Sequence, residues 1–300
     1  MNDGIDIKEN RLYTISDKLL PILLKDMTTG KNIIWATDIY SPRGDRYKSS
    51  RHIEPELITG RNGNVIRPRV EKSKHEQSLR VKAKAEVFTP SWICNCQNNL
   101  VDNSWFEKEA VFNTEIEKNW ITNKEKIIFS NTAERNWQSY VKANRLEITC
   151  GEAPYLTSRY DAVTGEYIEV QNRIGLLDRK LRVVSENTDN EETWLEWAKK
   201  AVMSCYGYDY QGDNVLLSRE NLLFTVLEYY ENKFSKQLQA DEVVQLAKII
   251  SWNIWQMDGL KFVVPDSCVA EKEEQLDLFA VNTESKPCEG CKRGVYNIFS

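Results

Sequence analysis

Three short stretches of the chain carry residue types that bind nucleotide-like cofactors. Cys150-Gly151-Glu152-Ala153 follows one predicted strand, Asp209 closes a second, and Asp258 lies near a third. At the carboxyl ends of parallel strands, a glycine turn lets the backbone approach a ligand, and an acid ending the next strand accepts ribose hydroxyls. The pattern predicts a cofactor site in which Asp209 binds a ribose and Asp258 an adenine amine. Each signal is weak alone, because a glycine turn is often only a turn and such an acid is often a cap.

Strands that alternate with helices must position these residues. Strands are predicted at 32–40, 145–149, 204–208 and 260–264, and helices at 17–27, 174–184, 191–203, 213–234 and 241–254. Asp189 with Glu192 resembles a capping box at the start of the helix 191–203. Alternation of this kind implies an α/β fold with a mostly parallel sheet and helices on its faces.

A further feature lies upstream, where Phe88-Thr89-Pro90 precedes a helix predicted from about 90 to 100. Threonine is a preferred N-cap, because its hydroxyl accepts a free backbone N–H of the first helical turn. Proline suits the first helical position, where its missing N–H costs nothing. Thr89 is therefore the predicted cap of this helix.

In this order, the stretches resemble the adenine-specific DNA methyltransferases of restriction–modification systems. Residues 87–90 are similar to the family's Phe-Thr-Pro element, 146–156 to its first motif (D-P-A-C-G-S-G-x-F-L), 207–222 to its second and 253–260 to its third. The family's proline is Ile148 here, and its second glycine is Ala153. The resemblance implies a Rossmann-like fold that binds S-adenosylmethionine through Phe88, Thr89, Pro90, Glu147, Cys150, Gly151, Ala153, Asp209 and Asp258.

The family's catalytic element, [D/N/S]-P-P-[Y/F/W], is missing from the chain. The sequence holds eight prolines and no two are adjacent. In that element a polar side chain and a backbone carbonyl accept the hydrogens of the adenine amine, and the aromatic ring stacks on the flipped base. We therefore expect a methylase-like protein that is inactive as a single chain, for which a partner subunit could supply the missing functions. The alternative is a non-enzymatic DNA- or protein-binding module built on a decayed methylase fold.

A basic segment at 43–84 could contact DNA. It holds twelve basic residues and five acidic ones, in a chain whose net charge is −5. A local basic stripe can bind phosphates even when the whole chain is acidic, although such a segment can equally be a solvated loop. The candidate phosphate-binding residues are Arg43, Arg46, Lys48, Arg61, Arg67 and Arg69.

The cysteines suggest a reducing compartment and one candidate metal site. Seven cysteines, an odd number, fit free thiols in a cytoplasm better than a disulfide framework. Cys288 and Cys291 form half of a zinc site, with Cys268 as a third candidate ligand; free thiols in a polar tail are the alternative. The chain shows neither a signal-peptide pattern nor an apolar run long enough for a membrane helix, so we expect a cytoplasmic protein with no membrane partner.

These observations predict three parts of the chain. Residues 1–84 form a basic, loop-rich N-terminal region. Residues 85–265 form the methyltransferase-like domain, and residues 266–300 form an acidic tail that contains cysteines.

Overall fold

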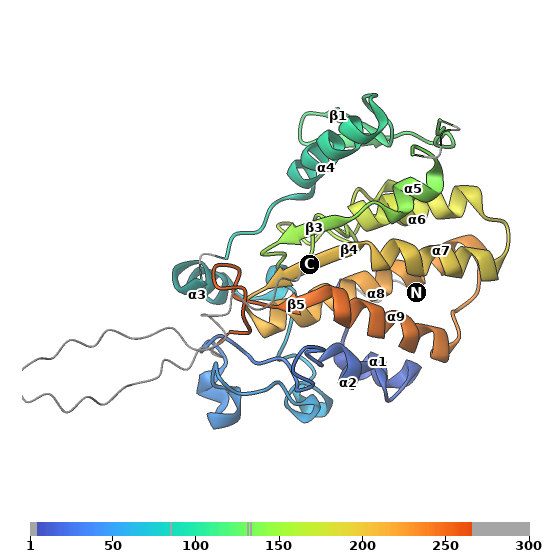
Figure 1. Ribbon diagram of the computed structural model, residues 1–300. Coiled ribbons are helices and arrows are strands. Elements are labelled where there is room, and N and C mark those ends of the chain that lie inside the picture. The colour runs from blue at the N-terminus through green and yellow to red at the C-terminus, as the bar shows by residue number, and fades with distance from the viewer. Residues whose placement is uncertain (1–4, 85, 131, 133, 266–300) are drawn as a thin grey trace, which may run out of the picture.

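The computed structural model describes residues 5–84, 86–130, 132 and 134–265 (Figure 1). Its helices are α1 (Glu9–Ile15), α2 (Leu19–Leu23), α3 (Lys74–Lys84), α4 (Ser91–Phe106), α5 (Trp137–Lys142), α6 (Leu176–Asn187), α7 (Glu191–Met203), α8 (Gly212–Phe234) and α9 (Ala240–Asn253). Its strands are β1 (Asn113–Ile116), β2 (Asn119–Thr122), β3 (Arg145–Ile148), β4 (Cys205–Asp209) and β5 (Ile254–Gln256).

The architecture is mixed α/β, with a small parallel sheet of three strands. The strands lie in the order β3-β4-β5, so their spatial order is also their order along the chain. Glu147 is in register with Gly207, and Gly207 with Ile254, so the carboxyl ends of all three strands lie at the same edge of the sheet. Strands β1 and β2 form a separate antiparallel hairpin beside α4 (Figure 1).

Helix α8 forms the centre of the molecule. It packs on β4 and β5, and the side chains along most of its length are buried. The N-terminal region approaches α8 so closely that a Cβ at Gly212 would lie 2.0 Å from the carbonyl oxygen of Ile34. Leu20 and Trp35 from this region share one hydrophobic cluster with Trp194 and Leu216. Residues 5–84 are thus packed into the same core as the sheet.

Most of the predicted helices are confirmed, whereas two predicted strands are wrong. Residues 32–40 form no strand but only isolated bridges, Asn32 with Lys25 and Ile34 with His52, and Ala36, with a φ of 52°, leaves the extended conformation. Residues 260–264 form no strand either, because Asp258 closes a turn in which its carbonyl accepts the N–H of Phe262 at 2.7 Å. The third strand of the sheet is β5, which precedes Asp258.

Two predicted helix caps are also corrected. Helix α7 is capped by Asn190, whose side chain accepts the N–H of Thr193 at 2.9 Å, and not by Asp189. Helix α4 begins at Ser91, and the N–H of Ser91 is bound at 2.7 Å by the carboxylate of Asp161, seventy residues away in the chain. Thr89 therefore does not cap this helix, because a more distant acid satisfies its first N–H.

Candidate functional site

The turn after β3 has an unusual backbone. Thr149, Gly151 and Ala153 have φ angles of 49°, 54° and 63°. Glycine adopts this left-handed region freely, but a β-branched residue such as Thr149 does so rarely. Such strain persists only where the surroundings hold it, and it often marks a functional site. Here Cys150 donates its N–H to the carbonyl of Tyr208 at 2.8 Å, which fixes the turn to β4.

Asp209 joins this turn to the start of α8. Its buried carboxylate accepts the N–H of Gly151 and the N–H of Gln211, both at 2.9 Å, and the side-chain amide of Asn214 at 3.3 Å. Burial raises the pKa of Asp209 to about 6. The structure therefore brings the predicted ribose ligand and the predicted glycine turn into direct contact.

Asp258 lies two residues beyond β5, at the carboxyl end of the neighbouring strand. The N–H of Met257, beside it, bonds the carbonyl of Asp209 at 2.9 Å. The half-buried carboxylate of Asp258 accepts the N–H of Leu260 at 3.0 Å. The two predicted acids thus lie at the ends of adjacent strands, although Asp258 was expected to precede a strand at 260–264 and instead follows β5.

Glu147 and Cys150 contact other parts of the protein in the interior. The buried carboxylate of Glu147 accepts the N–H groups of Tyr155 and Leu156 at 3.3 and 3.0 Å, and burial raises its pKa to about 8. A Cβ at Gly207 would lie 3.2 Å from the Cys150 Sγ, so the thiol packs directly on β4. Burial raises the pKa of Cys150 well above its usual value, which keeps it a thiol.

Phe88 covers the glycine turn. Its buried ring lies 3.3 Å from where a Cβ of Gly151 would be, so a larger residue at Gly151 would strike it. The guanidinium of Arg69 lies over the same ring, 5.3 Å from its centroid. The carbonyl of Thr89, one residue further, accepts the thiol of Cys94 at 3.7 Å, and Pro90 leads into α4. The structure therefore brings the Phe-Thr-Pro element to the turn after β3.

A polar interface on α6 positions α4 and hence this element. The buried guanidinium of Arg179 donates to Asp102 at 2.6 Å, to Asn99 at 2.7 Å and to Asn95 at 2.9 Å. All three acceptors lie on α4. Because such charge-assisted bonds have fixed directions, they define how α4 sits on the core.

The site includes a buried charge cluster that the sequence patterns did not predict. Asp213, in the first turn of α8, binds Arg80 at 2.7 Å, Tyr40 at 2.7 Å and Lys72 at 3.4 Å. Arg80 also pairs with Glu86 at 2.6 Å. The pKa of Asp213 is held well below its usual value, because the Arg80 and Lys72 charges outweigh its burial. Only the position of Asp213 near a helix N-terminus, where an acid is favoured, could have indicated it.

The predicted phosphate-binding residues differ in their surroundings. Arg46 pairs with Glu56, Lys48 with Asp45 at 2.7 Å, and Arg67 with Glu76 at 3.1 Å. The backbone N–H of Arg69 donates to Glu152 at 2.6 Å, while its side chain covers Phe88. The remaining two, Arg43 and Arg61, have exposed side chains.

The described residues also bear on metal binding and on open cavities. Within them, no group of three or more His, Cys, Asp or Glu side chains could hold a metal ion. Cys268, Cys288 and Cys291 lie outside the described residues. Three shallow depressions of about 650, 570 and 500 Å³ lie beside α2 and α9, beside α4, and along residues 45–56, and none of the three is lined by a predicted cofactor residue.

Across the part of the chain that the structure describes, none of the helices has the length and apolar character to cross a membrane. Comparison with protein-family models, with curated proteins and with solved structures finds no match to this chain.

Proposed function

We propose that this chain is an S-adenosylmethionine-binding protein with a Rossmann-like, methyltransferase-like architecture, similar to the DNA adenine methylases of restriction–modification systems. One observation carries the proposal. A strained glycine turn after β3, Asp209 at the end of β4 and Asp258 just after β5 meet at one edge of a parallel sheet. That edge is where parallel α/β sheets bind nucleotide-like ligands.

The residues at this edge fit the chemistry of the cofactor. A carboxylate at Asp209 can accept ribose hydroxyls, and a half-buried carboxylate at Asp258 can accept the adenine amine. Gly151 lets backbone approach a ligand, and Phe88 with Thr89 would flank the methionine part. When bound, the cofactor supplies an electrophilic methyl group; the protein residues bind and orient it.

In this proposal the chain does not transfer the methyl group alone. Methylation of the adenine amine requires acceptors for its hydrogens and an aromatic surface for the flipped base. The sequence has no adjacent prolines and so lacks the element that provides these groups. A cytoplasmic partner subunit would supply it, and DNA would be the substrate of the assembled enzyme.

Titration calorimetry with S-adenosylmethionine tests the proposal. We expect micromolar affinity for the wild-type chain and a loss of at least about 100-fold for Asp209→Ala, because an unpaired buried hydroxyl costs a few kcal/mol. Asp241→Ala, an exposed acid in the first turn of α9, is the matched control and should bind like wild type. Absence of heat from the folded wild-type chain would reject cofactor binding.

A second function is favoured by the saturation of the site. The Asp209 carboxylate already accepts three hydrogen bonds from the protein, and Phe88 lies over Gly151 beneath Arg69. These contacts suit a non-enzymatic DNA- or protein-binding module in which the former cofactor site stabilises the fold. In that case Asp209→Ala would lower the unfolding temperature, and neither the wild type nor the variant would bind S-adenosylmethionine.

A further inference from the structure

One face of the parallel sheet is apolar, and its β3 side is open to solvent. Leu146 and Ile148 on β3 alternate with the buried Glu147 and are 42% and 61% exposed. They are in register with Tyr206 and Tyr208 on β4, and Tyr208 with Trp255 on β5, so these side chains share a face. The rings of Tyr206 and Trp255 stack at 5.8 Å with an angle of 10°.

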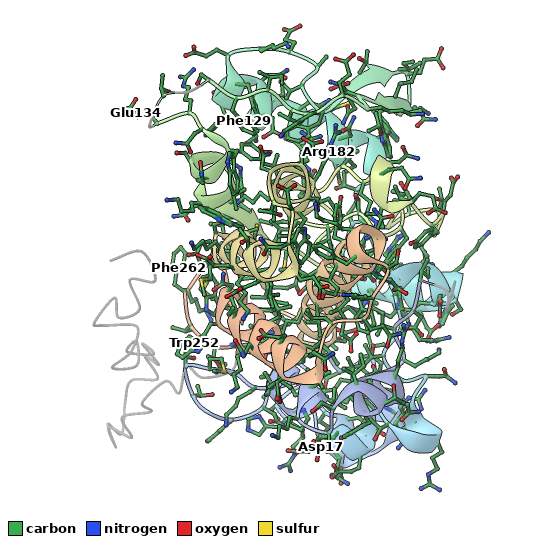
Figure 2. All side chains as sticks on the ribbon, turned by 90° about the vertical axis from the view of Figure 1, so that its right-hand side faces the viewer. Asp17, Phe129, Glu134, Arg182, Trp252 and Phe262 are labelled. Atoms are coloured by element: carbon green, nitrogen blue, oxygen red, sulfur yellow. The ribbon has the colours of Figure 1, made fainter. Side chains whose placement is uncertain are left out.

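Neighbouring segments extend this face. Trp252 at the end of α9 and Phe262 in the following loop are 51% and 50% exposed. Both point to the same side of the molecule in Figure 2. The loop packs on the face itself, since a Cβ at Gly259 would lie 2.7 Å from the ring of Tyr208. Met203, at the end of α7, is also exposed.

The topology explains why no helix covers this face. Both connections, β3 to β4 and β4 to β5, run in the same direction across the sheet. Parallel connections are almost always right-handed, so two steps in one direction place their helices on one face. Helix α8 covers that face and lies behind the strands in Figure 1. In complete doubly wound folds the strand order reverses and helices cover both faces.

The apolar area is of the size that proteins bury against other proteins. Leu146, Ile148, Met203, Trp252 and Phe262, each about half exposed, leave on the order of 500 Å² uncovered, if a free large side chain exposes roughly 150–250 Å². The largest exposed apolar patch of a typical monomer is about 300–600 Å² and is often functional, and a standard interface buries roughly 800 Å² on each partner. The face can therefore form the apolar centre of a stable interface.

We propose that a second copy of this chain covers this face, forming a two-fold dimer in which the two sheets pack face to face. Most soluble oligomers are two-fold homodimers, which require a self-complementary surface. This face meets that requirement because Leu146, Ile148, Tyr206 and Trp255 carry no charge that would repel its own copy. The charged groups beside it, Asp258 and Lys261, are of opposite sign and can pair across a two-fold axis.

Analytical ultracentrifugation of the full chain tests the dimer. We expect the wild type to sediment at about twice 34.9 kDa at micromolar concentration. Ile148→Asp and Trp252→Glu should each raise the dimer dissociation constant at least about 30-fold, as expected for central interface residues. Ile121→Asp is the matched control, because Ile121 is equally exposed, at 62%, but lies on the β1–β2 hairpin. It should leave the dimer intact.

Each outcome supports or overturns the proposal. The proposal is overturned if the wild type is still a monomer at 100 times that micromolar concentration. Hydrogen exchange of residues 145–148 then shows whether residues 266–300 cover the face or leave it exposed to solvent. A dimer that survives both variants also overturns it, because the interface must then lie elsewhere. The dimer does not depend on the proposed function. Trp252→Glu should be monomeric and still bind S-adenosylmethionine, so a failure of cofactor binding is separate from a failure of dimerisation.

Discussion

At the scale of single residues, the chain buries several ionisable groups that take no part in the proposed chemistry. Glu220 on α8 is fully buried, and both of its carboxylate oxygens lack a hydrogen-bond partner within the described residues. Glu9 at the start of α1 is also buried. The negative charge of Asp6 adds to the cost of ionising either carboxyl, and a charge on Glu9 adds to that of Glu220. Burial raises the pKa of Glu9 to about 8 and that of Glu220 well above its usual value. Burial therefore favours the protonated form of both side chains more strongly in the folded protein than in the unfolded chain.

We expect Glu220→Gln to stabilise the protein at alkaline pH. A carboxyl whose pKa is higher in the folded than in the unfolded state binds more protons when folded, so stability falls as pH rises above the unfolded pKa of about 4.3. Each raised carboxyl lowers the unfolding free energy by up to about 1.4 kcal/mol per pH unit in that range. Urea unfolding at pH 5 and pH 8 measures this slope, which should be shallower in Glu220→Gln.

The control for this effect is Glu231→Gln, which changes an exposed acid on the same helix. It should leave the slope between pH 5 and pH 8 as in the wild type. An equal slope in Glu220→Gln and wild type would mean that Glu220 is ionised in the folded protein, in conflict with its burial.

At the scale of elements, the sequence predicted helices well and their ends poorly. The helix 191–203 was predicted with its observed bounds, because its apolar spacing is helical. Its cap was misassigned by one residue, because the capping-box pattern fits Asp189 with Glu192 while the backbone places Asn190 at the cap. Such a choice depends on local backbone angles that side-chain types do not encode.

Mutating the two neighbouring residues distinguishes the two caps. Asn190→Ala removes the acceptor of the Thr193 N–H and should lower the unfolding free energy by about 1 kcal/mol. Asp189→Ala should change it by less than about 0.5 kcal/mol, as a surface substitution outside the cap. Chemical denaturation of both variants provides the measurement, and a larger effect from Asp189→Ala would show that the observed cap is wrong.

The candidate site was predictable where its residues follow local patterns. Gly151 and Asp209 were expected directly after strands, where turns and acids recur in parallel sheets, and they follow β3 and end β4. Asp258 was expected before a strand at 260–264, whereas it follows β5. The cluster around Asp213 was not found, because Lys72 and Arg80 reach it from more than 130 residues away in the sequence. The basic segment suggested a DNA-binding stripe. Two of its basic residues, Arg80 and Lys72, instead pair with the buried Asp213, and this pairing depends on tertiary contacts alone.

At the scale of the whole molecule, Arg219 links the N-terminal region to the sheet. Its buried guanidinium donates to the carbonyls of Leu23 and Lys25 at 2.6 and 2.9 Å, and to those of Ser251 and Ile254 at 3.3 and 2.6 Å. Burial lowers its pKa to about 10, so it remains charged at neutral pH. One side chain on α8 thus satisfies the carbonyls at the end of α2 and at the start of β5.

We therefore expect Arg219→Met to cost about 3–5 kcal/mol, because it leaves four carbonyls in the interior without a strong donor. Arg219→Lys keeps the charge but not the planar fork of donors, so it should recover only part of this loss. Arg46→Met, at an exposed ion pair, should cost less than about 1 kcal/mol.

The N-terminal region shares the core cluster with the sheet, so the wild type should unfold in one transition. Hydrogen exchange in Arg219→Met should rise first at residues 19–25. Unchanged exchange there would show that apolar packing alone, centred on Leu20 and Trp35, holds the N-terminal region on α8.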